Sequence, residues 1–254
     1  MSGSGVMVSE VAVPVAGGRV RGLQFRPPGD GPFPAVVLGA EATGINRFIR
    51  EVGIALAEAG FVAMVYDFFR GDGPEDPDDH SDVPAILRHI DRLDFRRATF
   101  DMLATVDFVR AEPDIDPLRV FAWGYCTGAT IALLAGCLDR TLAGTVLFYP
   151  SQPVFETLND RRPSHPIDLL WNHRSPMLLL YGDHDEVVPV AMIDEMARRC
   201  ETFGVQATIK VYPGAGHVFA GRHFGDAYRA EAAEDAWRTA LDFTRRVTTA
   251  GALR

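Results

Sequence analysis

The chain has 254 residues, of which 47% are hydrophobic and 23% charged, a composition typical of a folded globular protein and not of a disordered or fibrous one. Its 25 Lys and Arg against 34 Asp and Glu give a net charge of −9, which argues against a dedicated nucleic-acid binder and a protein of anionic membrane surfaces. Three cysteines without a CxxC pair exclude a disulfide framework and a zinc ribbon.

The first ten residues, MSGSGVMVSE, lack the basic and apolar regions of a signal peptide. No apolar stretch approaches the roughly 18 residues of a membrane span. We therefore expect a cytoplasmic protein without membrane or nucleic-acid partners, and poor order over residues 1–8.

The chain begins with a hairpin pattern, in which Glu10–Val15 and Arg19–Phe25 flank a Gly17-Gly18 turn. Near-continuous apolar runs follow, as is typical of parallel strands buried on both faces. These runs are Ala35–Leu38, Phe61–Tyr66, Leu118–Trp123, Gly144–Tyr149, Met177–Tyr181 and Ala207–Tyr212.

Amphipathic, helix-like segments alternate with these runs: Phe48–Ala59, Met102–Val109, Thr127–Leu138, Met192–Phe203 and Ala233–Val247. The alternation predicts one α/β domain over residues 1–254. Its sheet of about eight strands should be mostly parallel, with an antiparallel N-terminal hairpin and helices on both faces.

Two segments fit this alternation poorly. Gly71–Asp82 is rich in aspartate, but prolines interrupt it and its spacing is not that of an EF-hand, so a solvated acidic loop is favoured over a calcium site. Pro150–Arg174 is polar and rich in proline, which suits either a surface excursion or a rim over a binding site.

The motif Gly124-Tyr125-Cys126-Thr127-Gly128 lies directly between a predicted strand and a predicted helix. This is the pattern of a nucleophile elbow, with cysteine where serine is usual. Small residues at both ends of the motif permit the sharp turn, and the helix N-terminus favours a thiolate. A buried structural cysteine is the alternative, but the strand–turn–helix context favours a nucleophile at Cys126.

An acid and a histidine follow in the chain order of an α/β-hydrolase. Asp185 lies in the loop after the Met177–Tyr181 strand, and His217 follows the last strand. His217 would act as general base and acid, and Asp185 would orient it. Asp183 is the rival acid. We expect Cys137 and Cys200 to be packing residues, and the other histidines to be surface or structural residues: His80, His89, His165, His173, His184 and His223.

These motifs, together with Glu41 in the segment 39–46 and Ala215–Phe219, resemble the dienelactone hydrolase family of α/β-hydrolases. The resemblance implies that Glu41 interacts with Cys126 and helps to generate the thiolate. It also implies that the thiolate opens an enol-lactone or ester through a thioester, with the amides of Ala42 and Thr127 holding the oxyanion. No metal or organic cofactor is expected.

Family members bind the substrate carboxylate with two arginines, and here the sequence departs from the pattern. Arg70 lies one residue closer to Asp67 than the pattern requires, and Gly221 occupies the second position, with Arg222 next. Each arginine could bind substrate or be a surface cation.

Three functions follow from the sequence. The first is a cysteine-dependent hydrolase of the dienelactone hydrolase type. The second is a broader carboxylesterase or thioesterase with the same triad, and the third is a ligand receptor or redox sensor on a hydrolase fold. The expected partner is a small lactone or ester, and the expected state is a monomer or a small homo-oligomer.

Overall fold

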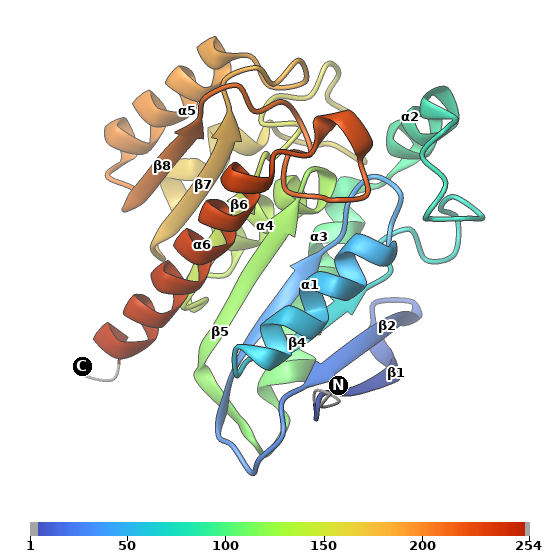
Figure 1. Ribbon diagram of the computed structural model, residues 1–254, viewed down its shortest axis with the longest axis vertical. Coiled ribbons are helices and arrows are strands. Elements are labelled where there is room, and N and C mark those ends of the chain that lie inside the picture. The colour runs from blue at the N-terminus through green and yellow to red at the C-terminus, as the bar shows by residue number, and fades with distance from the viewer. Residues whose placement is uncertain (1–4, 252–254) are drawn as a thin grey trace.

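A computed structural model describes residues 5–251 of the protein, and one eight-stranded sheet runs through it (Figure 1). The strand order is β1-β2-β4-β3-β5-β6-β7-β8. The strands are β1 (Met7–Val15), β2 (Gly18–Arg26), β3 (Phe33–Gly39), β4 (Val62–Tyr66), β5 (Ile115–Tyr125), β6 (Gly144–Phe148), β7 (Met177–Gly182) and β8 (Ala207–Tyr212).

The sheet is mixed in the way that the sequence predicts. β1 and β2 form an antiparallel hairpin, β2 pairs antiparallel with β4, and all pairs from β4 to β8 are parallel. The central strands β4 and β6 are buried along their whole length, which explains their continuous apolar sequences. This is the α/β-hydrolase fold, and the predicted fold class is confirmed.

Helices cover both faces of the sheet. α1 (Arg47–Glu58) and α6 (Ala230–Gly251) lie on one face, and α3 (Phe95–Arg110), α4 (Thr127–Leu138) and α5 (Val190–Phe203) lie on the other (Figure 1). α4 is buried almost entirely, as its uniformly apolar sequence requires. Among residues 5–251, no helix combines the length and the apolar content that a bilayer span needs.

The N-terminus differs from the expectation. Residues 1–4 lie outside the described residues, but Met7 and Val8 already pair with Arg26 and Phe25 in the β1–β2 ladder. The expectation of poor order over residues 1–8 is therefore wrong for Met7 and Val8, because the backbone hydrogen bonds of β2 hold them in the sheet.

The acidic segment Gly71–Asp82 is a loop, as predicted, and some of its carboxylates accept backbone hydrogen bonds. Asp78 accepts from the amide of Arg47 at 2.6 Å, and Asp82 caps helix α2 (Val83–Arg92) by accepting from the amide of Ala85 at 2.8 Å. Within the described part of the chain, no cluster of three or more His, Cys, Asp or Glu is arranged to hold a metal ion.

Three further elements were not predicted from the sequence, and the shortest of them is η2 (Gly225–Ala227). Helix α2 (Val83–Arg92) follows the acidic loop and stands beyond the carboxyl ends of the parallel strands (Figure 1). The short helix η1 (Pro166–Asn172) lies within the segment 150–174, and its Ile167 and Leu170 are buried. The segment is therefore partly anchored to the core and not a simple surface excursion.

Candidate active site

Cys126 occupies the sharp turn between β5 and α4. Its backbone has a φ of +52°, a conformation that a residue with a side chain rarely adopts. The turn depends on two glycines, because a Cβ on Gly128 would overlap the backbone of Gly39 and one on Gly124 would overlap the backbone of Gly128. The strained turn directs the thiol into a cavity at the carboxyl edge of the sheet.

His217 and Asp185 come from two loops at this same edge. Nε2 of His217 lies 3.2 Å from Sγ of Cys126, and Nδ1 lies 2.8 Å from Oδ2 of Asp185. The other oxygen of Asp185 accepts the amide hydrogens of Val187 and Val188, both at 2.8 Å. These amides orient the carboxylate, which in turn orients the imidazole with its Nε2 toward the sulfur.

Asp183, the alternative candidate for the acid, binds a backbone amide and not His217. Its Oδ1 accepts the amide hydrogen of Gly214 at 2.6 Å, which links the loop after β7 to the loop after β8. The structure thus pairs His217 with Asp185, and Asp183 supports the loop that carries the histidine.

The proton on His217 is held by its neighbours. Burial disfavours the imidazolium, but the interactions of His217 with Cys126 and Asp185 outweigh this and raise the pKa of His217 to about 10. An imidazolium facing Sγ at 3.2 Å is the natural counter-ion of a thiolate.

Glu41 lies in the loop after β3 and is only 3% exposed. The Tyr149 hydroxyl and the Asn46 side-chain amide donate to its two oxygens at 3.3 and 3.2 Å. Burial raises the pKa of Glu41 to about 7, against the opposing effects of Asn46, His217 and Tyr149. Among the described residues, the hydrogen bonds of Glu41 do not include one to Cys126, although both side chains line the same cavity.

The cavity has a volume of about 550 Å³ and also contains the two residues expected to bind an oxyanion, Ala42 and Thr127. Thr127 is the first residue of α4, so its amide hydrogen has no acceptor within the helix. Ser151 and Gln152, at the start of the segment 150–174, line the cavity too. That part of the segment is a rim over the site.

Sequence reasoning missed three contributions to this cavity. His80 and His223, which we expected to be surface or structural residues, both line it, and their loops meet where the His80 ring packs 4.7 Å from that of Phe224. α2 contributes an apolar wall. A sequence signal existed only for α2, whose apolar residues recur at helical spacing over 83–90.

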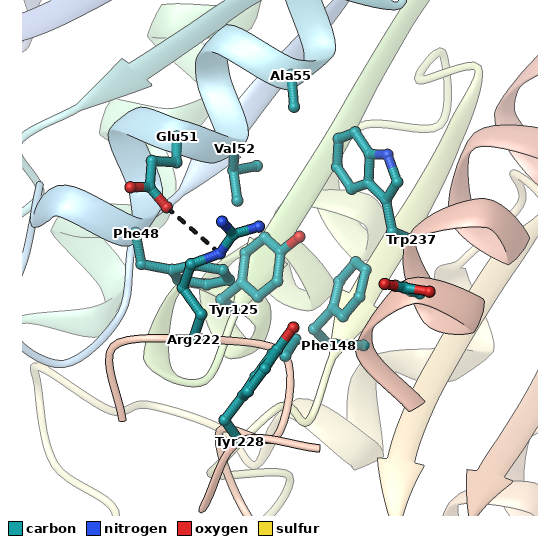
Figure 2. Close-up of a pocket in the computed structure, with 12 residues that line it drawn as sticks. Phe48, Glu51, Val52, Ala55, Tyr125, Phe148, Arg222, Tyr228 and Trp237 are labelled. Atoms are coloured by element: carbon teal, nitrogen blue, oxygen red, sulfur yellow. Dashed lines mark ion pairs between the residues drawn. The ribbon is translucent and has the colours of Figure 1, made fainter. Parts of the chain in front are cut away.

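The structure does not bring the two arginines to the cavity. Arg70 follows β4 and forms a two-pronged ion pair with Asp101 of α3, with distances of 2.8 and 2.7 Å. The side chain of Arg222 lies in a separate pocket between α1 and α6, where its Nε is 4.0 Å from Glu51 and Tyr125 is another of the lining residues (Figure 2). Both cations therefore have other neighbours.

Cys137 and Cys200 lie in α4 and α5 and are buried. Burial raises the pKa of Cys137 to about 12 and that of Cys200 to about 11, so both remain thiols at neutral pH. Their position agrees with a packing role.

The sequence and the fold of this chain are similar to those of known proteins. Residues 20–248 match the profile of the dienelactone hydrolase family. The chain belongs to the dienelactone hydrolase family. One family relative, the "Probable 2-oxo-3-(5-oxofuran-2-ylidene)propanoate lactonase" of Bradyrhizobium sp., is 34% identical over 220 residues, which cover 87% of this chain and 86% of the relative.

Two further relatives support membership of the dienelactone hydrolase family. The "Putative carboxymethylenebutenolidase" of Escherichia coli K12 is 28% identical over 94% of this chain and 86% of the relative. The crystal structure of a "Putative Dienelactone Hydrolase" from Klebsiella pneumoniae superposes with a TM-score of 0.86 at 26% identity, covering 94% of this chain and 98% of that one. Membership of this hydrolase family implies a small-molecule substrate.

Proposed function

We propose that the protein is a cysteine-dependent hydrolase that opens a lactone or cleaves a small ester through a thioester intermediate. The observation that carries the proposal is the continuous chain from Asp185 through His217 to Cys126, with distances of 2.8 and 3.2 Å, at the wall of a cavity. A nucleophile, a base and an orienting acid in this geometry are the parts that acyl transfer needs.

In the first half of the reaction, the Cys126 thiolate attacks the substrate carbonyl carbon and a C–S bond forms. The carbonyl oxygen takes up the negative charge, and the amides of Ala42 and Thr127 donate to it. The C–O bond to the leaving oxygen then breaks, and that oxygen takes the proton of the His217 imidazolium. In a lactone the new hydroxyl stays attached to the acyl group, and in an ester it departs as an alcohol.

In the second half, neutral His217 removes a proton from a water molecule as the water oxygen attacks the thioester carbon. The C–S bond breaks, the acid product leaves, and the imidazolium–thiolate pair is restored. Burial raises the pKa of Glu41 to about 7, so this carboxyl of the cavity can hold or release a proton near neutral pH, and we assign it to the control of the thiolate.

Two substrate types fit this chemistry. The relative from Bradyrhizobium, by its name a lactonase, supports lactone opening of the dienelactone hydrolase type. The position of Arg70 and Arg222 outside the cavity lining favours a broader esterase instead. A receptor or redox sensor is less well supported, because His217 lies within hydrogen-bonding distance of both Cys126 and Asp185, as a hydrolase requires.

The test is hydrolysis of cis- and trans-dienelactone and of p-nitrophenyl butyrate by the purified protein, with Cys126→Ala and His217→Ala as matched variants. The mechanism is supported if the wild type hydrolyses any of these substrates and both variants fail to do so. Hydrolysis of a dienelactone indicates the dienelactone hydrolase type, and hydrolysis of p-nitrophenyl butyrate alone indicates a broader esterase. Turnover that survives in Cys126→Ala refutes the cysteine mechanism. No turnover by the wild-type protein favours the receptor or sensor.

A further inference from the structure

One wall of the cavity that contains Cys126 is the apolar face of α2. Val83, Ile86, Leu87 and Ile90 recur at i, i+3, i+4 and i+7 on this helix, and all four line the cavity. Val83 is 55% exposed and Leu87 is 56% exposed. The helix thus presents Val83 and Leu87 to the cavity that contains the thiol, whereas Ile90 is only 6% exposed and packs in the core.

Exposed apolar side chains that face a cavity gain stability only when something apolar covers them. The rest of the lining is partly apolar as well, because it includes Val187, Val218 and Phe224, and Val187 is itself half exposed. Cys126 and His217 lie in the same cavity. The group that covers these walls is therefore part of the molecule that reacts with the thiol.

The charges around the cavity disfavour a carboxylate on that molecule. Among the described residues, neither lysine nor arginine lines the cavity, whereas the buried carboxyl of Glu41 does. Arg70 is bound to Asp101, and Arg222 lies beside Glu51 in the pocket of Figure 2. A substrate carboxylate would lose water here without gaining a guanidinium partner.

The two histidines of the lining do not replace the arginines. Burial lowers the pKa of His80, although Asp78, Asp79 and Asp76 oppose this, so its ring is neutral near pH 7. Nε2 of His223 lies 3.0 Å from the carboxylate of Glu51, which compensates any charge on that ring. The neutral ring of His80 can donate an N–H hydrogen bond to an ester oxygen.

We propose that this hydrolase selects uncharged esters or lactones with an apolar acyl group, and that α2 supplies the surface that binds this group. The inference rests on the proposed hydrolase function and names its substrate class. Val83 and Leu87 are then specificity-determining residues, since they contact the substrate away from the reacting carbonyl.

The first experiment compares two esters of nearly equal size, p-nitrophenyl valerate and mono-p-nitrophenyl succinate. They share a leaving group, and the second ends in a carboxylate where the first ends in a short alkyl chain. We expect kcat/KM to be at least about tenfold higher for the uncharged ester, because the carboxylate finds no lysine or arginine in the cavity and His217 is already paired with Asp185 and Cys126. Equal values, or a preference for the succinate ester, overturn the inference.

The second experiment changes the wall itself. Leu87→Ser should raise KM for the valerate ester about five- to tenfold with little change in kcat, since the apolar contact is the same in the ground and transition states. Leu87→Arg should lower kcat/KM for the valerate ester and raise it for the succinate ester. The ratio of the two kcat/KM values, which favours the valerate ester in the wild type, should therefore decrease or invert. Because Leu87 is exposed, both variants should keep the wild-type circular dichroism and unfolding temperature.

The matched control is Leu118→Arg, which places the same charge at an exposed leucine of β5 outside the cavity lining. It should leave both kcat/KM values unchanged. If Leu87→Arg behaves like this control, α2 does not bind the substrate and the inference fails while the hydrolase function stands. If Cys126→Ala hydrolyses both esters as well as the wild type, the proposed function fails and the inference with it.

Discussion

Sγ of Cys126 lies 3.2 Å from Nε2 of His217, although 91 positions separate the two residues in the sequence. The nucleophile elbow holds the sulfur and the loop after β8 holds the imidazole, so the pair forms only when the sheet is assembled. The reactivity that we predict for Cys126 follows from this contact, and the other cysteines have no comparable neighbour among the described residues.

Brief treatment of the folded protein with iodoacetamide near pH 7.5 should alkylate Cys126 and leave Cys137 and Cys200 unmodified. Only the thiolate reacts, and burial keeps the pKa of the other two thiols near 12 and 11. Peptide mass spectrometry measures the sites, and the same treatment in urea should modify all three cysteines. Equal labelling of Cys137 in the folded protein would contradict this prediction.

Asp185→Asn should reduce kcat by about 10² to 10⁴, because the amide no longer fixes the imidazole or stabilises its positive charge. The pKa of His217, now about 10, should fall in this variant, since Asp185 is one of the groups that raise it. Steady-state kinetics and the pH dependence of the thiolate absorbance measure the two effects. Asp183→Asn is the matched control and should change kcat by only a few-fold, because Asp183 bonds to Gly214 and not to His217.

Glu41→Gln should stabilise the protein at pH 8 more than at pH 5. Burial raises the pKa of Glu41 to about 7 from an ordinary value of 4.5, so the folded state binds this proton more tightly than the unfolded state does. The stability that the Glu41 carboxyl contributes in the wild-type protein is therefore greatest below about pH 4.5, and it is lost as the pH rises through about 7. The variant's gain in the free energy of unfolding over the wild type should be about 1–3 kcal/mol larger at pH 8 than at pH 5.

Urea unfolding at the two pH values measures this difference. Glu58→Gln on α1 is the control, because the Glu58 side chain is exposed and its replacement should alter stability little at either pH. A Glu41→Gln gain that is the same at pH 5 and pH 8 would show that the carboxyl does not titrate in this range.

Arg70→Met should lower the free energy of unfolding by about 2–4 kcal/mol, because it leaves the Asp101 carboxylate buried without its partner. The Asp101 side chain is 2% exposed and that of Arg70 is 21% exposed. Arg222→Met is the matched control and should cost less than about 1 kcal/mol, since its ion pair with Glu51 is exposed and long. Neither variant should raise KM, and a large increase in KM would place that arginine at the substrate.

Local sequence patterns were sufficient for most of the fold. The apolar runs at Val62–Tyr66 and Gly144–Phe148 predict buried parallel strands, because a strand covered on both faces has no polar side. The glycines two positions before and after Cys126 predict the sharp turn, because a Cβ on Gly124 would overlap the backbone of Gly128. These requirements act within a few residues of the chain, so the sequence alone displays them.

Helix α2 was missed even though its sequence contains the helical spacing of Val83, Ile86, Leu87 and Ile90. The element is short, it directly follows a loop of aspartates and prolines, and Val83 and Leu87 remain exposed instead of joining the core. His80 and His223 could not be assigned from sequence, because the cavity that they line is formed by loops far apart in the chain.

The sequence alone was enough to predict the α/β-hydrolase fold and the family, and to propose catalytic roles for Cys126, Asp185 and His217, because each lies in a local motif next to a strand end. The surroundings of the charged side chains became visible only in the folded structure. Asp101 of α3 binds Arg70, Glu51 of α1 lies beside Arg222, and α2 places apolar side chains over the thiol. An ion pair depends on which distant carboxylate comes within about 4 Å, and that distance is set by the packing of helices on the sheet.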